Sequence, residues 1–393
     1  MAKQNKPAIR FKEFTDAWEQ RKLGALCVEF KSGDFISASD IAENEAYPVY
    51  GGNGLRGFTN HYNHDGEYAL IGRQGALCGN VNYAVGKSYF TEHAVAVRAN
   101  KTNQTRFLYY LFSTMNLGQY SGQSAQPGLA VGNLVELENV VPSKPEQEKI
   151  ASFLSSLDNL ITLHQRKYDK LQVLKKAMLE KMFPKNGSSV PEIRFKGFTD
   201  AWEQRKLGEV VERITRKNEN LESTLPLTIS AQHGLINQNE FFDKRIASKD
   251  VSGYFLVRNG EFAYNKSTSS DAPWGAIKRL DRYESGVLST LYIVFKISDE
   301  RKTSSDYIVT YYNTDLWHKG IQAIAAEGAR NHGLLNVAPA DFFETNLTMP
   351  KDYAEQQQIG SFFQQLDHLI TLHQRELEKL QNIKKSMLEK MFV

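Results

Sequence analysis

Two stretches of the chain place apolar residues at heptad spacing. Residues 150–182 and 359–391 each carry this pattern for more than four heptads. The main seam holds Ile150, Leu157, His164, Leu171 and Met178 in the first stretch, and Ile359, Leu366, His373, Leu380 and Met387 in the second. Such a sustained pattern predicts a long helix that pairs with another helix as a coiled coil. At 1.5 Å per residue, each helix should be about 50 Å long.

The starts of both helices are marked in the sequence. Ser143 stands three residues before Glu146, and Asp352 stands three residues before Glu355. In a capping box, the first of these side chains bonds to the backbone at the helix start and the glutamate reaches back. We therefore expect a capping box at the start of each long helix.

A histidine lies near the middle of each predicted helix, in the apolar seam. If the two helices pack antiparallel, His164 and His373 can meet. The plain interpretation is a pair of neutral, hydrogen-bonded side chains. The alternative is a polar pair that fixes the register, as a buried asparagine does in coiled coils. A metal site is not favoured, because no third ligand is visible.

The segments before the two helices, which we call the first and second heads, have a different pattern. Runs rich in β-branched and aromatic residues, bounded by Gly and Asn, are typical of strands. These runs are 67–75, 88–97, 254–264 and 289–297, and helical patches occur at 105–120 and 305–325. Each head is therefore expected to be α+β.

The chain also repeats itself in two blocks, which organises the whole sequence. Residues 7–24 match 191–208 at 16 of 18 positions, and residues 146–183 match 355–392 at 25 of 38 positions. The intervening segments, about 25–141 and 209–349, show no obvious similarity. Repeated blocks around dissimilar segments favour a binding protein whose two heads recognise different ligands. Joining the chain ends would regenerate the junction between the halves, so we expect pseudo-twofold symmetry.

Composition narrows the class of protein without deciding it. The 393 residues allow two or three domains, and the formal net charge of +3 means that any nucleic-acid site must be a local patch. The only two cysteines, Cys27 and Cys78, are not spaced as metal ligands and favour a reduced, cytoplasmic chain. We find no apolar signal core and no apolar run near the roughly 20 residues of a membrane span.

The sequence contains no catalytic motif in the structural context that the motif requires. Gly52–Gly57 fits G-x-G-x-x-G, but the residues that follow do not predict a helix, so a dinucleotide site is not favoured. The chain contains no Pro-Pro dipeptide, which removes the usual amino-methyltransferase site. It also contains no G-x-S-x-G elbow and no H-E-x-x-H motif. An enzyme is therefore the weakest interpretation, and no catalytic or metal-ligating residue is assigned.

Glycine-rich turns in both heads carry polar and basic side chains. Arg, Lys, Gln and Asn can hydrogen-bond to base edges, and Ser can bind phosphate. A solvated turn is the simpler interpretation of any single residue, but together they favour a DNA-binding surface. The candidate DNA-binding residues are Asn53, Arg56, Arg73, Gln74, Gln123 and Gln126 in the first head, and Gln232, His233, Lys266, Ser267, Ser269, Arg330, Asn331 and His332 in the second. Arg73 and Arg330 are the first choices for base contacts.

One combination of motifs occurs twice and is quite specific. The segments VPSKPEQEKIASFLSSLDNLI (141–161) and MPKDYAEQQQIGSFFQQLDHLI (349–370) share a Pro, then Glu-Gln, then Ile, then Leu-Asp at the start of a long helix. With AWEQRKLG at the start of each head and IGRQG in the first, the chain resembles the DNA specificity subunits of type I restriction-modification systems. The second head has RNGEFAYNKS in a place comparable to IGRQG, so base-contact roles do not transfer directly between the heads.

The resemblance implies a non-catalytic, sequence-specific DNA-binding subunit. Each head would read one half of a bipartite double-stranded DNA target, and the helices would hold two methyltransferase subunits and set the gap between the half-sites. Restriction and motor subunits would join this core. S-adenosylmethionine, ATP and Mg²⁺ would belong to the partners, with no cofactor in this chain. The alternative is a coiled-coil adaptor whose two heads bind proteins or glycans.

We therefore expect an α+β fold. It consists of two α/β target recognition domains separated by a long antiparallel coiled coil of two helices, with pseudo-twofold symmetry. The expected divisions are 1–145 for the first recognition domain, 146–183 for the first spacer helix, 184–350 for a linker and the second recognition domain, and 351–393 for the second spacer helix.

Overall fold

The chain folds into two compact units that are discontinuous in sequence. The structure is a computed structural model and describes residues 6–122, 128–185, 187–230, 233–270, 272–325, 333 and 335–393. Unit 1 combines Met1–Arg166 with His373–Val393, and unit 2 is Lys167–Leu372. Each unit therefore contains one head and a part of both long helices. The divisions expected from the sequence, at 145, 183 and 350, lie at the ends of the long helices, whereas the two units divide within these helices. The assignment of recognition domains stays a prediction.

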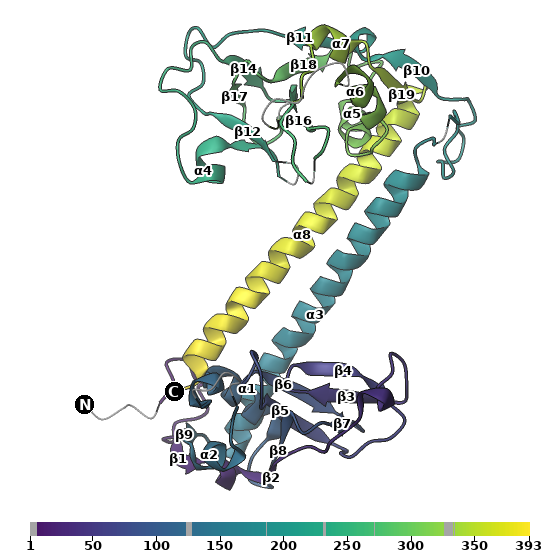
Figure 1. The fold of residues 1–393 in the computed structure, drawn as a ribbon. Coiled ribbons are helices and arrows are strands. Elements are labelled where there is room, and N and C mark those ends of the chain that lie inside the picture. The colour runs from purple at the N-terminus through teal and green to yellow at the C-terminus, as the bar shows by residue number, and fades with distance from the viewer. Residues whose placement is uncertain are drawn as a thin grey trace. The chain divides into compact units, whose positions relative to one another are not determined.

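Both long helices are continuous. They are α3 (Lys144–Lys181) and α8 (Tyr353–Met391), of 38 and 39 residues, labelled in Figure 1. At 1.5 Å per residue they are about 57 and 58 Å long. The α+β fold class with long helices is confirmed, and the helices begin and end within two residues of the expected bounds. No helix among the described residues combines the length and the apolar character needed to cross a membrane.

Within unit 1 the two helix segments run antiparallel. Asp158 of α3 forms an ion pair with Lys384 of α8 at 2.5 Å, and six residues further along α3, His164 meets His373. The order along α8 is thus the reverse of the order along α3. The two histidine Nδ1 atoms lie 3.1 Å apart. Because a hydrogen bond between them needs one donor and one acceptor, at least one Nδ1 is unprotonated. The expected meeting of the two histidines is confirmed.

Three sheets and two α-helices make up the described part of the first head. A four-stranded antiparallel sheet has the order β2-β8-β5-β6, a three-stranded sheet has the order β4-β3-β7, and β1 pairs with β9. The elements are β1 (Glu19–Lys22), η1 (Leu23–Leu26), β2 (Cys27–Ser32), η2 (Ala38–Asp40), β3 (Tyr47–Gly51), β4 (Gly54–Thr59), β5 (Glu67–Gly72), β6 (Val81–Val85), β7 (Tyr89–Phe90), β8 (Ala94–Ala99), α1 (Thr105–Thr114), η3 (Leu117–Tyr120), α2 (Val131–Glu136) and β9 (Glu138–Val141). Alternate residues of β5 and β8 pack with α1 and the start of α3 in one core.

The second head shares two sheets with the first despite its different sequence, but its other strands pair as β12-β13 and β14-β17 instead of forming a three-stranded sheet. Its four-stranded sheet has the order β11-β18-β15-β16, and β10 pairs with β19 as β1 does with β9. The elements are β10 (Glu203–Lys206), η4 (Leu207–Glu209), β11 (Val211–Ile214), β12 (Leu227–Ser230), β13 (Gly234–Asn237), α4 (Gln238–Phe242), β14 (Phe255–Arg258), β15 (Phe262–Asn265), β16 (Ala276–Arg279), β17 (Ser285–Leu288), β18 (Ile293–Ile297), α5 (Ser305–Tyr311), α6 (His318–Ala325), α7 (Pro339–Phe343) and β19 (Asn346–Met349). The helical patch expected at 305–325 is split into α5 and α6.

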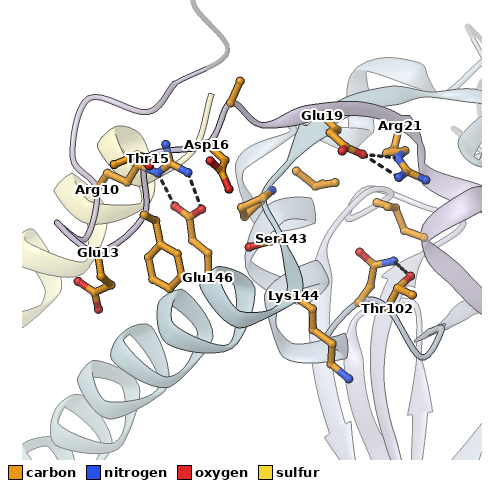
Figure 2. A pocket seen from close by; sticks show the side chains of 16 residues that line it. Arg10, Glu13, Thr15, Asp16, Glu19, Arg21, Thr102, Ser143, Lys144 and Glu146 are labelled. Carbon is orange, nitrogen blue, oxygen red and sulfur yellow. Dashed lines mark hydrogen bonds and ion pairs between the residues drawn. The ribbon is translucent and has the colours of Figure 1, made fainter.

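A buried ion pair joins the first repeated block to the start of α3. Arg10 donates from Nε and Nη2 to the two carboxylate oxygens of Glu146, at 2.7 and 2.8 Å (Figure 2). The indole Nε1 of Trp18 donates to the same carboxylate at 3.3 Å. The Glu146 side chain is 1% exposed, and its hydrogen bonds raise the pKa of the Arg10 guanidinium. We call these three residues the first clamp.

Unit 2 contains the same arrangement, which we call the second clamp. Arg194 binds both carboxylate oxygens of Glu355 at 2.7 and 2.8 Å, and the Trp202 indole donates at 3.3 Å. The expected capping boxes need correction. Asp352 does cap its helix, since its carboxylate accepts from the Ala354 amide at 2.7 Å. The glutamates, however, face arginine and tryptophan from the preceding repeat, because a buried guanidinium offers a carboxylate more than a helix-terminal amide does.

The end of each long helix is anchored in a head by a repeated phenylalanine. In unit 1, Phe392 stacks on Phe107 with ring centroids 5.5 Å apart. In unit 2, Phe183 stacks on Tyr307 at 5.9 Å. The backbone amide of Ile9 also donates to Lys390 at 2.9 Å, as the amide of its repeat counterpart in unit 2 does to Lys181. The repeated blocks therefore form the same type of contact between helix end and head in both units.

Candidate nucleic-acid interface

Two of the glycine-rich turns of the first head lie against each other. A Cβ atom on Gly72, at the end of β5, would stand 2.2 Å from the carbonyl oxygen of Gly52, so only glycine allows this approach. The amide of Arg73 donates to the carbonyl of His93 at 2.9 Å. A Cβ atom on Gly52 would lie 3.0 Å from the same carbonyl. The β3–β4 turn, the loop after β5 and the β7–β8 connection therefore converge.

Four candidate residues of the first head come together in this way. Asn53, Arg56 and Gln74 are exposed, and Arg73 is half-buried. Arg73 donates from Nε to the Leu129 carbonyl at 3.3 Å and from Nη1 to Ser32 Oγ at 3.2 Å. These bonds fix the orientation of a guanidinium that has five N–H donors. The first head thus presents a positioned arginine beside exposed amide side chains, as base readout requires.

The second head has a basic residue at the same place in its sheet. Lys266 follows β15, the third strand of β11-β18-β15-β16, as Arg73 follows β5 in β2-β8-β5-β6. The Leu335 amide donates to the Lys266 carbonyl at 2.9 Å, and the Leu129 amide donates to the Arg73 carbonyl at 2.9 Å. The structural counterpart of Arg73 is therefore Lys266, although the two sequence segments show no motif in common.

The environment of Lys266 is also similar to that of Arg73. Its ammonium donates to the Val337 carbonyl at 3.4 Å, and burial lowers its pKa. The next two candidates along the chain, Ser267 and Ser269, are exposed. Ser269 Oγ accepts from the Ala272 amide at 3.1 Å, which holds the loop in a turn. These residues form one loop that starts at the end of β15.

The remaining candidates are not joined to this loop in the structure. His233 is exposed in the turn between β12 and β13, on a different sheet from Lys266. Gln123, Gln126, Gln232, Arg330, Asn331 and His332 lie outside the described residues. Two described residues next to these segments do contact the candidate loops. Gly128, after the segment of Gln123 and Gln126, forms a β-bridge with Gln74. Gly333, after His332, accepts from the Thr268 amide at 2.7 Å. Arg330 as a base contact stays a prediction.

The site also contains residues that the sequence did not single out. Glu92 and His93, in the connection between β7 and β8, form an ion pair at 3.2 Å and are partly exposed. Asn82 lies beside the β3–β4 turn, where a Cβ atom on Gly54 would be 3.0 Å from its Oδ1. The available signal was the run of polar residues directly before a buried strand, since loops at strand ends often carry function.

Comparison with known proteins shows which proteins the chain is similar to. The family model described as "Type I restriction modification DNA specificity domain" matches residues 15–173. Residues 15–173 are therefore similar to that family over about two fifths of the chain. Over 156 residues the chain is 44% identical to the type I restriction enzyme EcoprrI specificity subunit of Escherichia coli, a match covering 39% of this chain and 39% of that relative. The matched region contains most of the first head, Trp18 and Glu146 of the first clamp, and the first part of α3.

More distant relatives extend the comparison. The chain is 32% identical over 117 residues to the MjaIX specificity subunit of Methanocaldococcus jannaschii, a match covering 27% of each chain. Both curated relatives are thus matched over less than half of their length. A crystal structure of the type I restriction-modification S subunit from M. genitalium matches 99% of both chains with a TM-score of 0.70 at 15% identity, which shows that the folds are alike. The resemblance to specificity subunits is confirmed.

Within the ranges that the structure describes, no group of three or more His, Cys, Asp or Glu side chains is placed to hold a metal ion. Cys27 and Cys78 are both free thiols, and burial raises the pKa of the Cys27 thiol to about 12. Such a thiol stays protonated near neutral pH and is a poor nucleophile and metal ligand.

Proposed function

We propose that this chain is the DNA specificity subunit of a type I restriction-modification complex. Each head reads one half of a bipartite target in double-stranded DNA, and partner subunits methylate or cut the DNA. The chain itself is non-catalytic and works in the cytoplasm. S-adenosylmethionine, ATP and Mg²⁺ belong to two methyltransferase subunits and to the restriction and motor subunits.

One observation carries this proposal. The two heads differ in sequence. Each presents a basic side chain, Arg73 or Lys266, directly after the third strand of its own four-stranded sheet. Each stands beside exposed polar side chains, and each head is mounted on a repeated frame. A duplicated frame with different polar surfaces suits a reader of two different half-sites. A catalytic subunit would instead need reacting groups held in a fixed geometry.

A pair of matching grooves supports the expectation of two identical partners. In unit 1 a groove of about 740 Å³ is lined by Gln381, Lys385, Leu388 and Phe392, together with the end of α1. In unit 2 a groove of about 560 Å³ is lined by the repeat counterparts of these residues: Gln172, Lys176, Leu179 and Phe183. The four shared residues favour two copies of one partner chain, which the methyltransferase subunits provide.

Salt dependence tests the proposal against the adaptor alternative. DNA binding releases counterions from phosphates, so the logarithm of the binding constant should fall linearly with the logarithm of the salt concentration. We expect such a slope for a duplex that carries the target, measured by fluorescence anisotropy on the complex with methyltransferase. Each neutralised phosphate contributes about 0.9 to the slope. A complex that binds a protein or glycan but shows no affinity for duplex DNA would support the adaptor.

Arg73 and Lys266 should affect different half-sites. We expect Arg73→Ala to relax one base position in one half-site and Lys266→Ala to relax one position in the other. Each change should cost about 1–3 kcal/mol of discrimination. Mapping methylated bases in cells carrying the complete system measures both effects. Arg21→Ala, on the repeated strand β1 and bonded to Glu19, is the control. A uniform loss of affinity across sequences would show phosphate contacts instead.

A further inference from the structure

A carboxylate stands in the middle of the candidate interface of the first head. Glu92 lies in the connection between β7 and β8 and pairs through Oε1 with His93 Nε2 at 3.2 Å. About a third of its side chain is exposed, 34% by area. All other candidate residues of this head are amides or arginines, which contain N–H donors. An ionised carboxylate can only accept hydrogen bonds, so Glu92 adds a chemically different group to the site.

The backbone around Glu92 is rigid. Its amide donates to the Asp34 carbonyl at 3.1 Å, and the Ala94 amide closes the turn on the Thr91 carbonyl at 2.9 Å. The carbonyl of His93 accepts from the Arg73 amide and packs on Gly52. Glu92 is therefore held one residue from the contact that joins the turn of Asn53 to the loop of Arg73. A group on such a fixed turn can be placed precisely against a ligand.

The carboxylate is only partly satisfied in its present position. Its Oε2 atom is buried and has no hydrogen-bond partner among the residues that the structure describes. A buried acceptor without a partner costs free energy, and native structures contain few of them. Turning the side chain outward would give up the contact with His93 and would relieve the unpartnered oxygen.

The chemistry of DNA limits what such a group can recognise. A carboxylate is repelled by phosphates, so it does not increase general affinity for DNA. In the major groove the only hydrogen-bond donors on the bases are the exocyclic amines, N4 of cytosine and N6 of adenine. We propose that Glu92 is a specificity-determining residue of the first head that accepts a hydrogen bond from an exocyclic base amine. This inference rests on the proposed function, because it takes the first head to be a reader of DNA.

The test combines a protein variant with a base that lacks its amine. The half-site of the first head is the one that changes when residues 25–141 are exchanged. In the complex with methyltransferase, Glu92→Ala should relax one position of this half-site and reduce discrimination there by roughly 5- to 150-fold. At that position, replacing adenine by purine or cytosine by 2-pyrimidinone should weaken the wild-type complex by a similar factor. The same replacement should leave the Glu92→Ala complex unaffected.

Two further variants sharpen the result. Glu92→Gln should shift the position toward adenine, because glutamine pairs with adenine N6 and N7 in a bidentate way. Glu45→Gln removes an exposed carboxylate from the same head, two residues before the start of β3, whereas the candidate site lies at the far end of that strand. It should leave the target unchanged.

The outcomes separate this inference from the proposed function. If Glu92→Ala leaves the target unchanged, raises affinity uniformly for all sequences, or stays sensitive to loss of the amine, Glu92 does not read a base and the inference is overturned. The proposed function survives all three results, provided that the wild-type complex still methylates a bipartite target. A wild-type complex that does not distinguish DNA sequences overturns both.

Discussion

Replacing residues 25–141 with the corresponding segment of a relative is expected to change one half of the methylated target and to leave the other half unchanged. A changed half-site introduces about three mismatched base pairs against the old target, at about 1–3 kcal/mol each. The exchanged complex should therefore lose affinity for the old target by two orders of magnitude or more. Mapping methylated bases in cells that carry the exchanged chain with unmodified partners measures both half-sites at once.

The structure gives the physical reason for this independence. The exchanged segment enters the frame after β1 and leaves it in β9, and these strands pair directly, with Glu19 opposite Val141. Its first residue lies in η1, directly after β1, and its last residue pairs with β1, so both ends lie close to one small sheet. The matched control exchanges the second variable segment, 209–349, which should alter the other half-site. A target in which both halves change after a single exchange would contradict the assignment of one head to one half-site.

Glu146→Ala is expected to destabilise unit 1 severely. The carboxylate is buried and accepts three hydrogen bonds, two from Arg10 and one from Trp18. Its removal leaves the partly buried guanidinium of Arg10 without its partner; breaking a fully buried pair costs about 3–5 kcal/mol, which is the upper limit here. Hydrogen exchange should show the loss in unit 1, since opening can occur in cooperative parts of a structure. The same substitution at Glu355 should destabilise unit 2 through Arg194.

Glu148→Ala provides the matched control for this prediction. Glu148 lies one residue beyond Gln147 on α3, and its side chain is 56% exposed. Its ion pair with Lys144 is solvated, and such pairs contribute about 0–1 kcal/mol. If Glu146→Ala and Glu148→Ala have equally small effects on the free energy of unfolding, the clamp does not hold the head to the helix. A loss of hydrogen-exchange protection confined to unit 2 after Glu146→Ala would also show that the first clamp does not hold its head to the helix.

The comparison of sequence and structure separates local patterns from distant contacts. Heptad spacing and terminal signals located α3 and α8 to within two residues, because helices depend on neighbouring residues. The capping-box expectation failed at its glutamates because Arg10 is 136 positions away from Glu146 in the chain. A local pattern cannot reveal such a partner. The convergence of Gly52 and Gly72 was hidden for the same reason.

The candidate site shows the same limit in a different form. Sequence patterns identified the turns that carry Asn53 and Arg73, since glycine and polar residues mark them. In the second head they indicated only a comparable segment, RNGEFAYNKS, because the equivalence of Arg73 to Lys266 lies in sheet order and in one backbone hydrogen bond. Glu92 was missed because the run of polar residues before β8 marks a loop but does not distinguish one glutamate in it from a solvated side chain.

The clamps have a consequence for how this chain can evolve. Arg10, Trp18 and Glu146 all lie in the repeated blocks, as do their partners in unit 2. A recombination event between the repeats would therefore carry a whole variable segment from one position to the other and leave both ion pairs intact. The head can therefore change by exchange of a whole segment as well as by point mutation, while the contacts that fasten it to its helix stay the same.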